Sequence, residues 1–370
     1  MEVPLLVVWL FTVLGCQSTL VDAGEVDGAR YLYGTVGARG NGLARVTIEV
    51  EEGEDALLVS SRPVEPPFEV FVRRLTDPNG VNVLLASDLT GIQFSKTNAV
   101  FVDAVSTLNW PVSDADAALV PGTYELEIGV VDDTLNFASQ AVDIDVLLKS
   151  DEDFATGALA VSVVYTDGLE EDDSVVDAVD DALAQWQALY AQAGIDVQFD
   201  VVVVDESGLL PPAFGLEERY VEFSEATPAR TVTLVLSETI AIDDLEVLGI
   251  AGDIPAPLIP TTRSAVQISL AMAAGPDGSF DDLDTRILAE TMAHETAHYL
   301  GLFHPVEREA WRQWDILEDT SQCRNESACV ERLGGNLMFP YPVCNLRTCT
   351  PQNELSANQV SVLNRAVAVR

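Results

Sequence analysis

Positively charged residues are scarce in this sequence. It contains only two lysines, Lys96 and Lys149, and its 19 basic residues are outnumbered by 60 acidic ones, which gives a formal net charge of −41. A surface this negative repels polyanions, which disfavours nucleic acid and anionic lipid headgroups, and we expect no nucleic-acid partner. The excess of acid has two interpretations: a solvated surface that serves solubility or salt tolerance, or binding sites for calcium.

The N-terminal hydrophobic run is short. It lies within residues 4–14 and is about a dozen residues long, too short to span a bilayer and typical of a signal peptide over residues 1–16. The Val-Leu-Gly-Cys sequence at residues 13–16 resembles a bacterial lipobox, in which Cys16 is lipidated and becomes the new N-terminus. We therefore expect an exported cell-envelope lipoprotein that contacts the membrane only through a lipid anchor. Secretion without lipid into the extracellular space is the alternative, and Glu2 departs from the positive charge that precedes most export signals.

Cysteine is rare, with five residues in the chain. If Cys16 carries lipid, four cysteines remain close together near the C-terminus: Cys323, Cys329, Cys344 and Cys349. An even, clustered set in an exported chain predicts two disulfide bonds, and their pairing is open because four cysteines allow three connectivities. A structural zinc site is the alternative, but the intervening segments of five, fourteen and four residues differ from the short Cys-x2-4-Cys pairs of such sites.

Histidine is rarer still, and all three histidines fall within eleven residues. On a helix, His294 and His298 are four positions apart, so both imidazoles project from one face and can share a metal ion. Glu295 follows His294 directly, off the ligand face but within reach of a water bound to that metal. Gly301 allows the positive φ that ends a helix, and the chain can then turn back so that His304 supplies a third nitrogen.

Three neutral protein ligands predict a catalytic zinc site, because they leave the fourth position of a tetrahedral zinc ion open for water. Zinc lowers the pKa of that water and polarises a scissile carbonyl, while Glu295 takes the proton and returns it to the leaving amine. The predicted activity is that of an exported zinc-dependent endopeptidase with a protein or peptide substrate. The alternative is a surface adhesion or binding lipoprotein with an inactive peptidase-like domain, although every catalytic residue type is present.

The length of 370 residues predicts about two domains in an α+β or α/β multidomain chain, which we expect to be monomeric. Residues 17–29 are small and acidic and predict a short tether. Residues 30–150 show about seven short alternating strands separated by turn sequences, which predicts an immunoglobulin-like β-sandwich. It contains no histidine or cysteine, so it is either an adhesion or substrate-presenting module or a spacer that stabilises its neighbour.

The periodicity changes after residue 150, and residues 155–370 predict an α/β catalytic domain. Strands are expected at 158–165, 196–204 and 231–236, with a helix at 173–193. A further strand at 265–270 is expected at the edge of the sheet, where an extended peptide could pair with it and lie across the zinc. The N-cap candidates for the metal-binding helix are the acids Asp281, Asp282 and Asp284.

Residues 294–304 have the pattern H-E-x-x-H-x-x-G-x-x-H, and on it the sequence resembles the metzincin zinc endopeptidases. A methionine turn follows in that family, and residues 334–341 offer one in the sequence Gly-Gly-Asn-Leu-Met-Phe-Pro-Tyr. The resemblance implies that Met338 packs beneath the three imidazoles. It also implies a twisted, mostly parallel sheet with an antiparallel edge strand, an active-site helix, the methionine turn and a C-terminal helix.

Within the metzincins, residues 155–370 look most similar to the pappalysin-like bacterial branch. The resemblance rests on Gly-Ile-Ala at residues 249–251 followed by Pro255, on the acidic residues 315–320, on the Asn-Leu-Met turn, and on residues 355–359 at the start of a last helix. The family assignment is carried by the histidine motif, whereas these four features carry the branch.

The resemblance also implies calcium ligands at Asp315, Glu318 and Asp319, for which a solvated acidic loop is the alternative. The sequence departs from the branch at Pro305, which is typical of serralysins. Serralysins and astacins carry a tyrosine two places after the methionine, but this chain has Pro340 there, so no tyrosine ligand is assigned.

Overall fold

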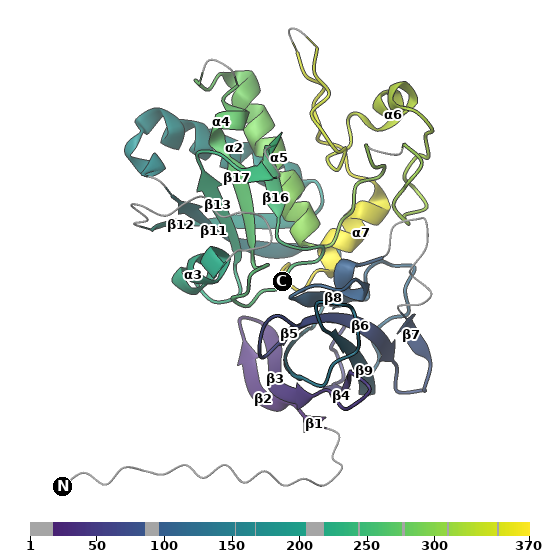
Figure 1. Ribbon diagram of the computed structural model, residues 1–370. Helices are drawn as coiled ribbons and strands as arrows, with labels where there is room; N and C mark the ends of the chain where they lie inside the picture. The colour runs from purple at the N-terminus through teal and green to yellow at the C-terminus, as the bar shows by residue number, and fades with distance from the viewer. Residues whose placement is uncertain are drawn as a thin grey trace, which may run out of the picture.

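The computed structural model describes residues 18–85, 96–151, 153–166, 168–204, 218–242, 245–275, 278–308, 311–345 and 348–370. It has two bodies, one built of strands and one of mixed helices and strands (Figure 1). The predicted signal sequence, with the lipidation site Cys16, lies outside the described residues. Among the helices that are described, none combines the length and the apolar character needed to cross a membrane.

The first body is a β-sandwich of two five-stranded sheets. One sheet has the strand order β1 (Ser18–Thr19), β4 (Leu43–Val50), β9 (Gly122–Val131), β6 (Glu69–Thr76) and β7 (Asn82–Leu85). The other has the order β2 (Val21–Val26), β3 (Ala29–Gly37), β10 (Ala141–Lys149), β5 (Ala56–Pro63) and β8 (Ser106–Trp110). Alternating side chains from the two sheets, among them Ile48, Val72 and Val146, form one buried core between them.

Three expectations for this region change. The predicted tether instead contributes β1 and β2, and the side chains of β2 are almost all exposed, so the sequence shows no apolar alternation there. One of the seven strands predicted from alternation, at residues 99–106, is wrong, because a 3-10 turn, η1 (Asn98–Val100), lies there and β8 begins only at Ser106. The described strands exceed the seven expected, so the immunoglobulin-like form of the sandwich stays a prediction.

The second body contains a five-stranded sheet in the order β12 (Ile195–Val203), β11 (Gly157–Tyr165), β13 (Val232–Ser237), β17 (Ala265–Ser269) and β16 (Gly249–Ala251). All neighbours are parallel except β16, which is antiparallel to β17. A mostly parallel sheet with an antiparallel edge strand is therefore confirmed. The edge is β16 rather than the predicted 265–270 strand, since β17 is hydrogen-bonded on both sides and wholly buried.

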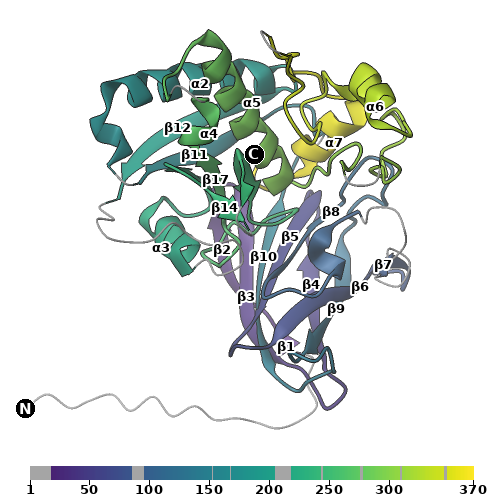
Figure 2. The ribbon, with the colours of Figure 1, turned by 45° about the horizontal axis from the view of Figure 1, so that its top comes forward.

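Helices cover both faces of this sheet (Figures 1 and 2). On one face, α2 (Asp173–Ala191) packs against α5 (Asp282–Tyr299), and the hydroxyl of Tyr190 donates to the carbonyl of Ala293 at 2.8 Å. On the other face, α3 (Glu218–Ala226) packs through Phe223. The remaining elements are η2 (Leu169–Glu171), β14 (Ala241–Ile242), β15 (Leu245–Glu246), α4 (Leu270–Ala273), α6 (Glu326–Leu333) and the C-terminal helix α7 (Ala357–Arg365).

Local sequence explains where the two long helices begin. Asp172 caps α2 through a hydrogen bond from the backbone of Ser174. Asp281 caps α5 in a reciprocal capping box with Asp284, which confirms the predicted N-cap region. The cap fixes the start of α5, and therefore fixes which residues of the helix face the sheet and which face the cavity beside it.

The two bodies share buried structure. Leu58 and Leu147 of the sandwich belong to the same apolar cluster as Val367 of the C-terminal segment. Lys149, only 1 % exposed, donates to the carbonyl of Asn364 at 2.8 Å. The C-terminus lies where the two bodies meet (Figures 1 and 2). The sandwich is thus packed directly on the second body.

Candidate metal centre

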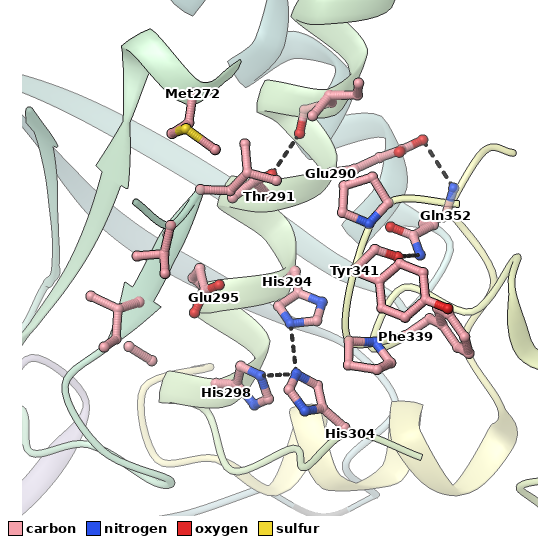
Figure 3. Close-up of a pocket in the computed structure, with 18 of the residues that line it drawn as sticks. Met272, Glu290, Thr291, His294, Glu295, His298, His304, Phe339, Tyr341 and Gln352 are labelled. Atoms are coloured by element: carbon pink, nitrogen blue, oxygen red, sulfur yellow. Dashed lines mark hydrogen bonds between the residues drawn. The ribbon is translucent and has the colours of Figure 1, made fainter. Parts of the chain in front are cut away.

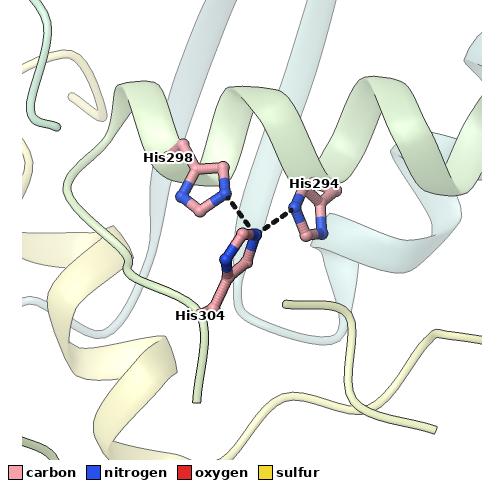
Figure 4. A group of neighbouring side chains, drawn as sticks. All are labelled: His294, His298 and His304. Carbon is pink, nitrogen blue, oxygen red and sulfur yellow. Dashed lines mark hydrogen bonds between the residues drawn. The ribbon is translucent and has the colours of Figure 1, made fainter. Parts of the chain in front are cut away.

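The three histidines lie at the C-terminal end of α5 and on the turn that follows it (Figure 4). His294 and His298 are one helical turn apart, and their ring centroids are separated by 4.7 Å. The helix stops where Gly301 adopts a φ of +116°, a conformation that side chains rarely permit. The N–H of Gly301 donates to the carbonyl of His298 at 2.8 Å, and the chain then turns so that His304 faces the helix.

The Nε2 atoms of the three imidazoles converge. Nε2 of His304 lies 3.2 Å from that of His294 and 3.1 Å from that of His298. A tetrahedral zinc ion with Zn–N bonds of about 2.0–2.1 Å holds its ligand nitrogens about 3.4 Å apart, close to these separations. Within the described part of the chain, no other group of three or more His, Cys, Asp or Glu side chains is spaced to hold a metal ion. The three predicted ligands therefore come together in one site.

Backbone carbonyls orient two of the imidazoles. Nδ1 of His294 lies 2.7 Å from the carbonyl oxygen of Leu337, and Nδ1 of His298 lies 2.5 Å from that of Leu302. A carbonyl only accepts hydrogen bonds, so each Nδ1 carries the proton of the neutral ring. The lone pair of each Nε2 is then directed into the site, which is the tautomer that a metal requires.

The third imidazole is oriented by a carboxylate, since Nδ1 of His304 lies 3.0 Å from Oε1 of Glu307. Such a partner fixes the tautomer and the orientation of the ring. Replacing Glu307 by glutamine should therefore weaken zinc binding by about 10- to 100-fold. Competition with a zinc-sensitive dye would measure the change, and Glu331→Gln, an exposed residue of α6, is the matched control. Equal affinities in the two variants would contradict this role for Glu307.

Burial shifts the pKa of His294 and of His298 in the opposite direction from the pKa of Glu295. It lowers the pKa of His294 to about 3 and takes the pKa of His298 well below its ordinary value, with the neighbouring imidazoles adding to both shifts. It raises the pKa of Glu295 to about 8, although a hydrogen bond from the backbone of Ala251 opposes the shift. Neutral imidazoles are the metal-binding form, and a cation beside Glu295 favours its ionised form.

The edge strand β16 lies directly against α5 at Glu295 (Figure 3). A Cβ placed on Gly249 would come within 2.6 Å of Cγ of Glu295 and 3.1 Å of Cγ2 of Thr291. Both neighbours belong to α5, whose position is fixed by its packing against the sheet. Only glycine allows the strand and the helix to approach this closely.

Replacing Gly249 by alanine should therefore displace β16 or rotate Glu295. A displacement of about 1 Å is enough to lower the predicted peptide hydrolysis by about 100-fold, while zinc content should stay unchanged because none of the three histidines is touched. Peptide cleavage rates and zinc analysis would test both halves. Gly37, the last residue of β3, provides the control, because nothing lies within 4 Å of the carbon that alanine would add there. Gly37→Ala should change neither quantity.

The methionine turn is held by side-chain amides. The N–H of Met338 donates to Oδ1 of Asn336 at 2.9 Å, and Nδ2 of Asn336 donates to Oε1 of Gln359 in α7 at 2.7 Å. Met338 is fully buried and shares an apolar cluster with Ala297 of α5. Its predicted role as the floor beneath the imidazoles stays a prediction.

The four C-terminal cysteines form two short-range disulfides, Cys323–Cys329 and Cys344–Cys349. Of the three possible pairings, the chain therefore uses the one that joins sequence neighbours. The second disulfide lies against α5, because Nη2 of Arg286 donates to the carbonyl of Cys349 at 2.9 Å.

A cavity of about 470 Å³ opens beside the histidines. The side chain of Glu295 and the strand β16 lie on one side of it, and Phe339 and Tyr341 lie on the other (Figure 3). Its apolar lining includes Leu248, Ile250, Met272, Ile287, Phe339 and Pro340. Glu290 closes one end, where its Oε1 accepts from Arg286 at 2.8 Å and from the backbone of Gln352 at 3.0 Å.

The predicted calcium ligands are not brought together. Asp319 is used to cap α7, since its carboxylate accepts from the Ser356 hydroxyl and the Asn358 backbone, both at 2.8 Å. Asp315 accepts from the backbone of Leu317 at 3.3 Å, and burial raises its pKa to about 7. The acidic loop is therefore tied to α7, and with Glu318 it forms no carboxylate cluster of metal-binding spacing.

The sequence prediction omits the groups that orient the ligands. Glu307 follows His304 by three residues, and an acid so close to a predicted ligand is a usable signal. The carbonyls of Leu302 and Leu337 leave no signal, because every residue has a carbonyl. The network around Glu290 leaves none either, because its partner Gln352 is distant in the sequence.

No protein-family model matches the chain, and no curated protein is significantly similar to it in sequence. Among solved structures, archaemetzincin from Methanopyrus kandleri is similar at 14 % identity, with 57 % of this chain and 88 % of that chain covered and a TM-score of 0.30. Metalloproteinase-II from Bacteroides fragilis is similar at 12 % identity, with 60 % and 62 % covered and a TM-score of 0.34. Likeness at this level assigns no family, and the metzincin and pappalysin-like assignments stay predictions.

Proposed function

We propose that the chain is an exported zinc-dependent endopeptidase of the metzincin type. The observation that carries the proposal is the convergence of the three imidazole Nε2 atoms. Nε2 of His304 lies 3.2 Å from that of His294 and 3.1 Å from that of His298. Each ring is already oriented by an acceptor at its Nδ1, so the site needs no rearrangement to bind a metal.

The donor set fits zinc. Three neutral nitrogens at nearly tetrahedral separation suit a borderline-soft ion and leave a coordination position open. When bound, zinc supplies a Lewis acid that activates water and polarises a carbonyl. Asp315, Glu318 and Asp319 offer no comparable set of ligands for calcium, so calcium is not part of the proposal.

Glu295 is the proposed proton carrier. It lies on α5 next to the first ligand, at the side of the cavity that faces β16 (Figure 3). Its carboxylate takes the proton of the attacking water and then passes it to the nitrogen of the leaving amine, so one side chain serves as base and acid. Ala251 helps to keep the carboxylate oriented through its backbone N–H.

An extended polypeptide is the proposed substrate. In the described part of the chain, β16 pairs only with β17, so its outer edge offers backbone groups to a further strand. A peptide added there would run beside Glu295, and one of its side chains would enter the cavity between β16 and residues 339–342. The apolar walls of this cavity favour an apolar side chain.

The two disulfides are compatible with an exported protein. We propose a bacterial cell-envelope lipoprotein anchored at Cys16, with secretion without lipid as the alternative. Mass spectrometry of the mature N-terminus distinguishes them: an acylated Cys16 supports the anchor, and any unmodified N-terminus contradicts it.

Chelation tests the metal requirement. The purified protein should contain one zinc ion per chain, and removing it with phenanthroline should abolish peptide hydrolysis, because the water then has no Lewis acid to activate it. Adding zinc back should restore the rate. Persistent hydrolysis by a preparation shown to be free of zinc would contradict the proposal.

A further inference from the structure

The segment that follows the edge strand β16 is hydrogen-bonded to the sandwich. The backbone N–H of Asn98 donates to the carbonyl of Ile254 at 2.8 Å, and Nδ2 of Asn98 donates to Oδ1 of Asp253 at 3.1 Å. The same Oδ1 accepts from the backbone N–H of Ile254 at 2.7 Å. Asp253 is only 7 % exposed, so it relies on these donors in place of water.

A second contact with the sandwich lies at the other end of the same loop. Nη2 of Arg263 donates to both carboxylate oxygens of Asp103, at 2.9 and 3.0 Å. Asp103 in turn exchanges two backbone hydrogen bonds with Val70 of the sandwich sheet. The loop between β16 and β17 is therefore held at both of its ends by the sandwich.

The sandwich turn that contains Asn98 is itself held in place by the sandwich. Ala99 and Val100 of η1 are buried in the sandwich core. The carbonyl of Ala99 accepts from the hydroxyl of Ser106 at 2.8 Å, and that hydroxyl accepts from the backbone of Val72 at 3.2 Å. These contacts anchor the turn in both the core and the backbone of the sandwich.

The loop between β16 and β17 also reaches the candidate active site. Ile254 lines the cavity beside the histidines, and Ala251, three residues earlier, contacts the carboxylate of Glu295. The backbone of Ala256 donates to the carbonyl of Tyr299, the last residue of α5, at 2.9 Å. One short segment therefore joins the sandwich, the edge strand and the metal-binding helix.

We propose that the sandwich turn formed by residues 98–103 is a positioning element of the active site, which fixes β16 beside Glu295 by holding the loop at residues 253–263. Asn98 is the positioning residue: it touches neither the ligands nor the cavity. This inference rests on the proposed peptidase function for its catalytic consequence, but its structural content does not.

Hydrogen exchange tests the structural content without a substrate. In the full-length protein, Asn98→Leu keeps a side chain of similar size but donates no hydrogen bond to Asp253. Amides of residues 249–254 should exchange about 10-fold faster than in the wild type, because the loop loses a hydrogen bond to the buried carboxyl group of Asp253. Arg230→Gln is the control, because Arg230 bonds the sandwich at Val26, on another part of the interface.

Kinetics test the catalytic content. Asn98→Leu should raise KM for long peptides by about 10-fold, since β16 binds the substrate, and should leave the zinc content unchanged, since none of the three histidines is touched. The double variant Asn98→Asp/Asp253→Asn reverses the direction of the side-chain hydrogen bond and should restore both exchange and KM. Asp103→Asn weakens the ion pair with Arg263 and provides a milder variant if Asn98→Leu fails to fold.

Unchanged exchange at residues 249–254 in Asn98→Leu and in Asp103→Asn overturns the proposal, and so does an equal change in Arg230→Gln. A double variant that restores neither quantity also contradicts it. If the wild-type protein cleaves no peptide, the proposed function fails, whereas the exchange comparison still decides whether the sandwich holds β16.

Discussion

Replacing Glu295 by alanine should lower kcat for peptide hydrolysis by about 100- to 10,000-fold while the protein keeps its zinc. The reason lies in the geometry: the three imidazole nitrogens converge as proposed metal ligands, whereas Glu295 faces β16 instead of the triad (Figure 3). Removing its carboxylate deletes the proposed proton carrier and leaves every proposed ligand in place. Initial rates on a quenched fluorescent peptide, with zinc analysis of the same sample, would measure both effects.

The control for this variant is Glu331→Ala, which removes an exposed carboxylate from α6. It should leave the rate and the zinc content unchanged. If Glu295→Ala lost its zinc as well as its activity, Glu295 would act as a structural support of the site and the proposed proton transfer would lose its evidence.

Replacing His304 by alanine should abolish stable zinc binding. Removing a ligand costs more than removing its hydrogen-bonding partner, so we expect zinc affinity to fall by more than about 100-fold. His304 is the best of the three to remove, because it lies on the turn after α5 with 22 % of its side chain exposed, whereas His298 is buried in the helix. Its loss should therefore leave the fold intact.

Thermal melting with and without zinc separates these contributions. The wild type should gain about 2.7 kcal/mol when free zinc is at 100 times its dissociation constant. At the same zinc concentration His304→Ala should gain almost nothing, yet it should melt like the wild type when both are free of metal. A variant that kept the full zinc-dependent stabilisation would show that His304 is not a ligand.

The parts of the structure that sequence predicts well are those governed by local periodicity. The face of α2 that carries Trp186 and Tyr190 follows from helical spacing, and so does the common face of His294 and His298. The N-cap of α5 follows from the acids near Asp281. In each case the signal lies within a few turns of one element.

The parts that sequence fails to predict depend on distant partners. β16 spans only Gly249–Ala251, too short to show any period, and its strand identity comes from pairing with β17. β2 belongs to the sandwich through backbone bonds while its side chains stay exposed. The contact between Asn98 and Asp253 joins residues 155 positions apart, so no local pattern announces it.

The sandwich illustrates the same limit. Its alternating pattern predicts strands, but a pattern of alternation does not reveal which surface is covered by another body. Leu58 and Leu147 resemble any other inward-facing residues in the sequence, although they belong to the cluster that includes residues of α5. The packing of the sandwich on the second body therefore becomes visible only in three dimensions.

The central claim is that the three histidines and Glu295 form a peptide-cleaving zinc site. Digestion of a proteome-derived peptide library with the zinc-loaded wild type and with Glu295→Ala tests it most directly. We predict internal cleavage of extended peptides by the wild type, no cleavage by the variant, and one zinc ion per chain in both. Equal cleavage by the two proteins, or no cleavage by a wild type that holds its zinc, would contradict the account.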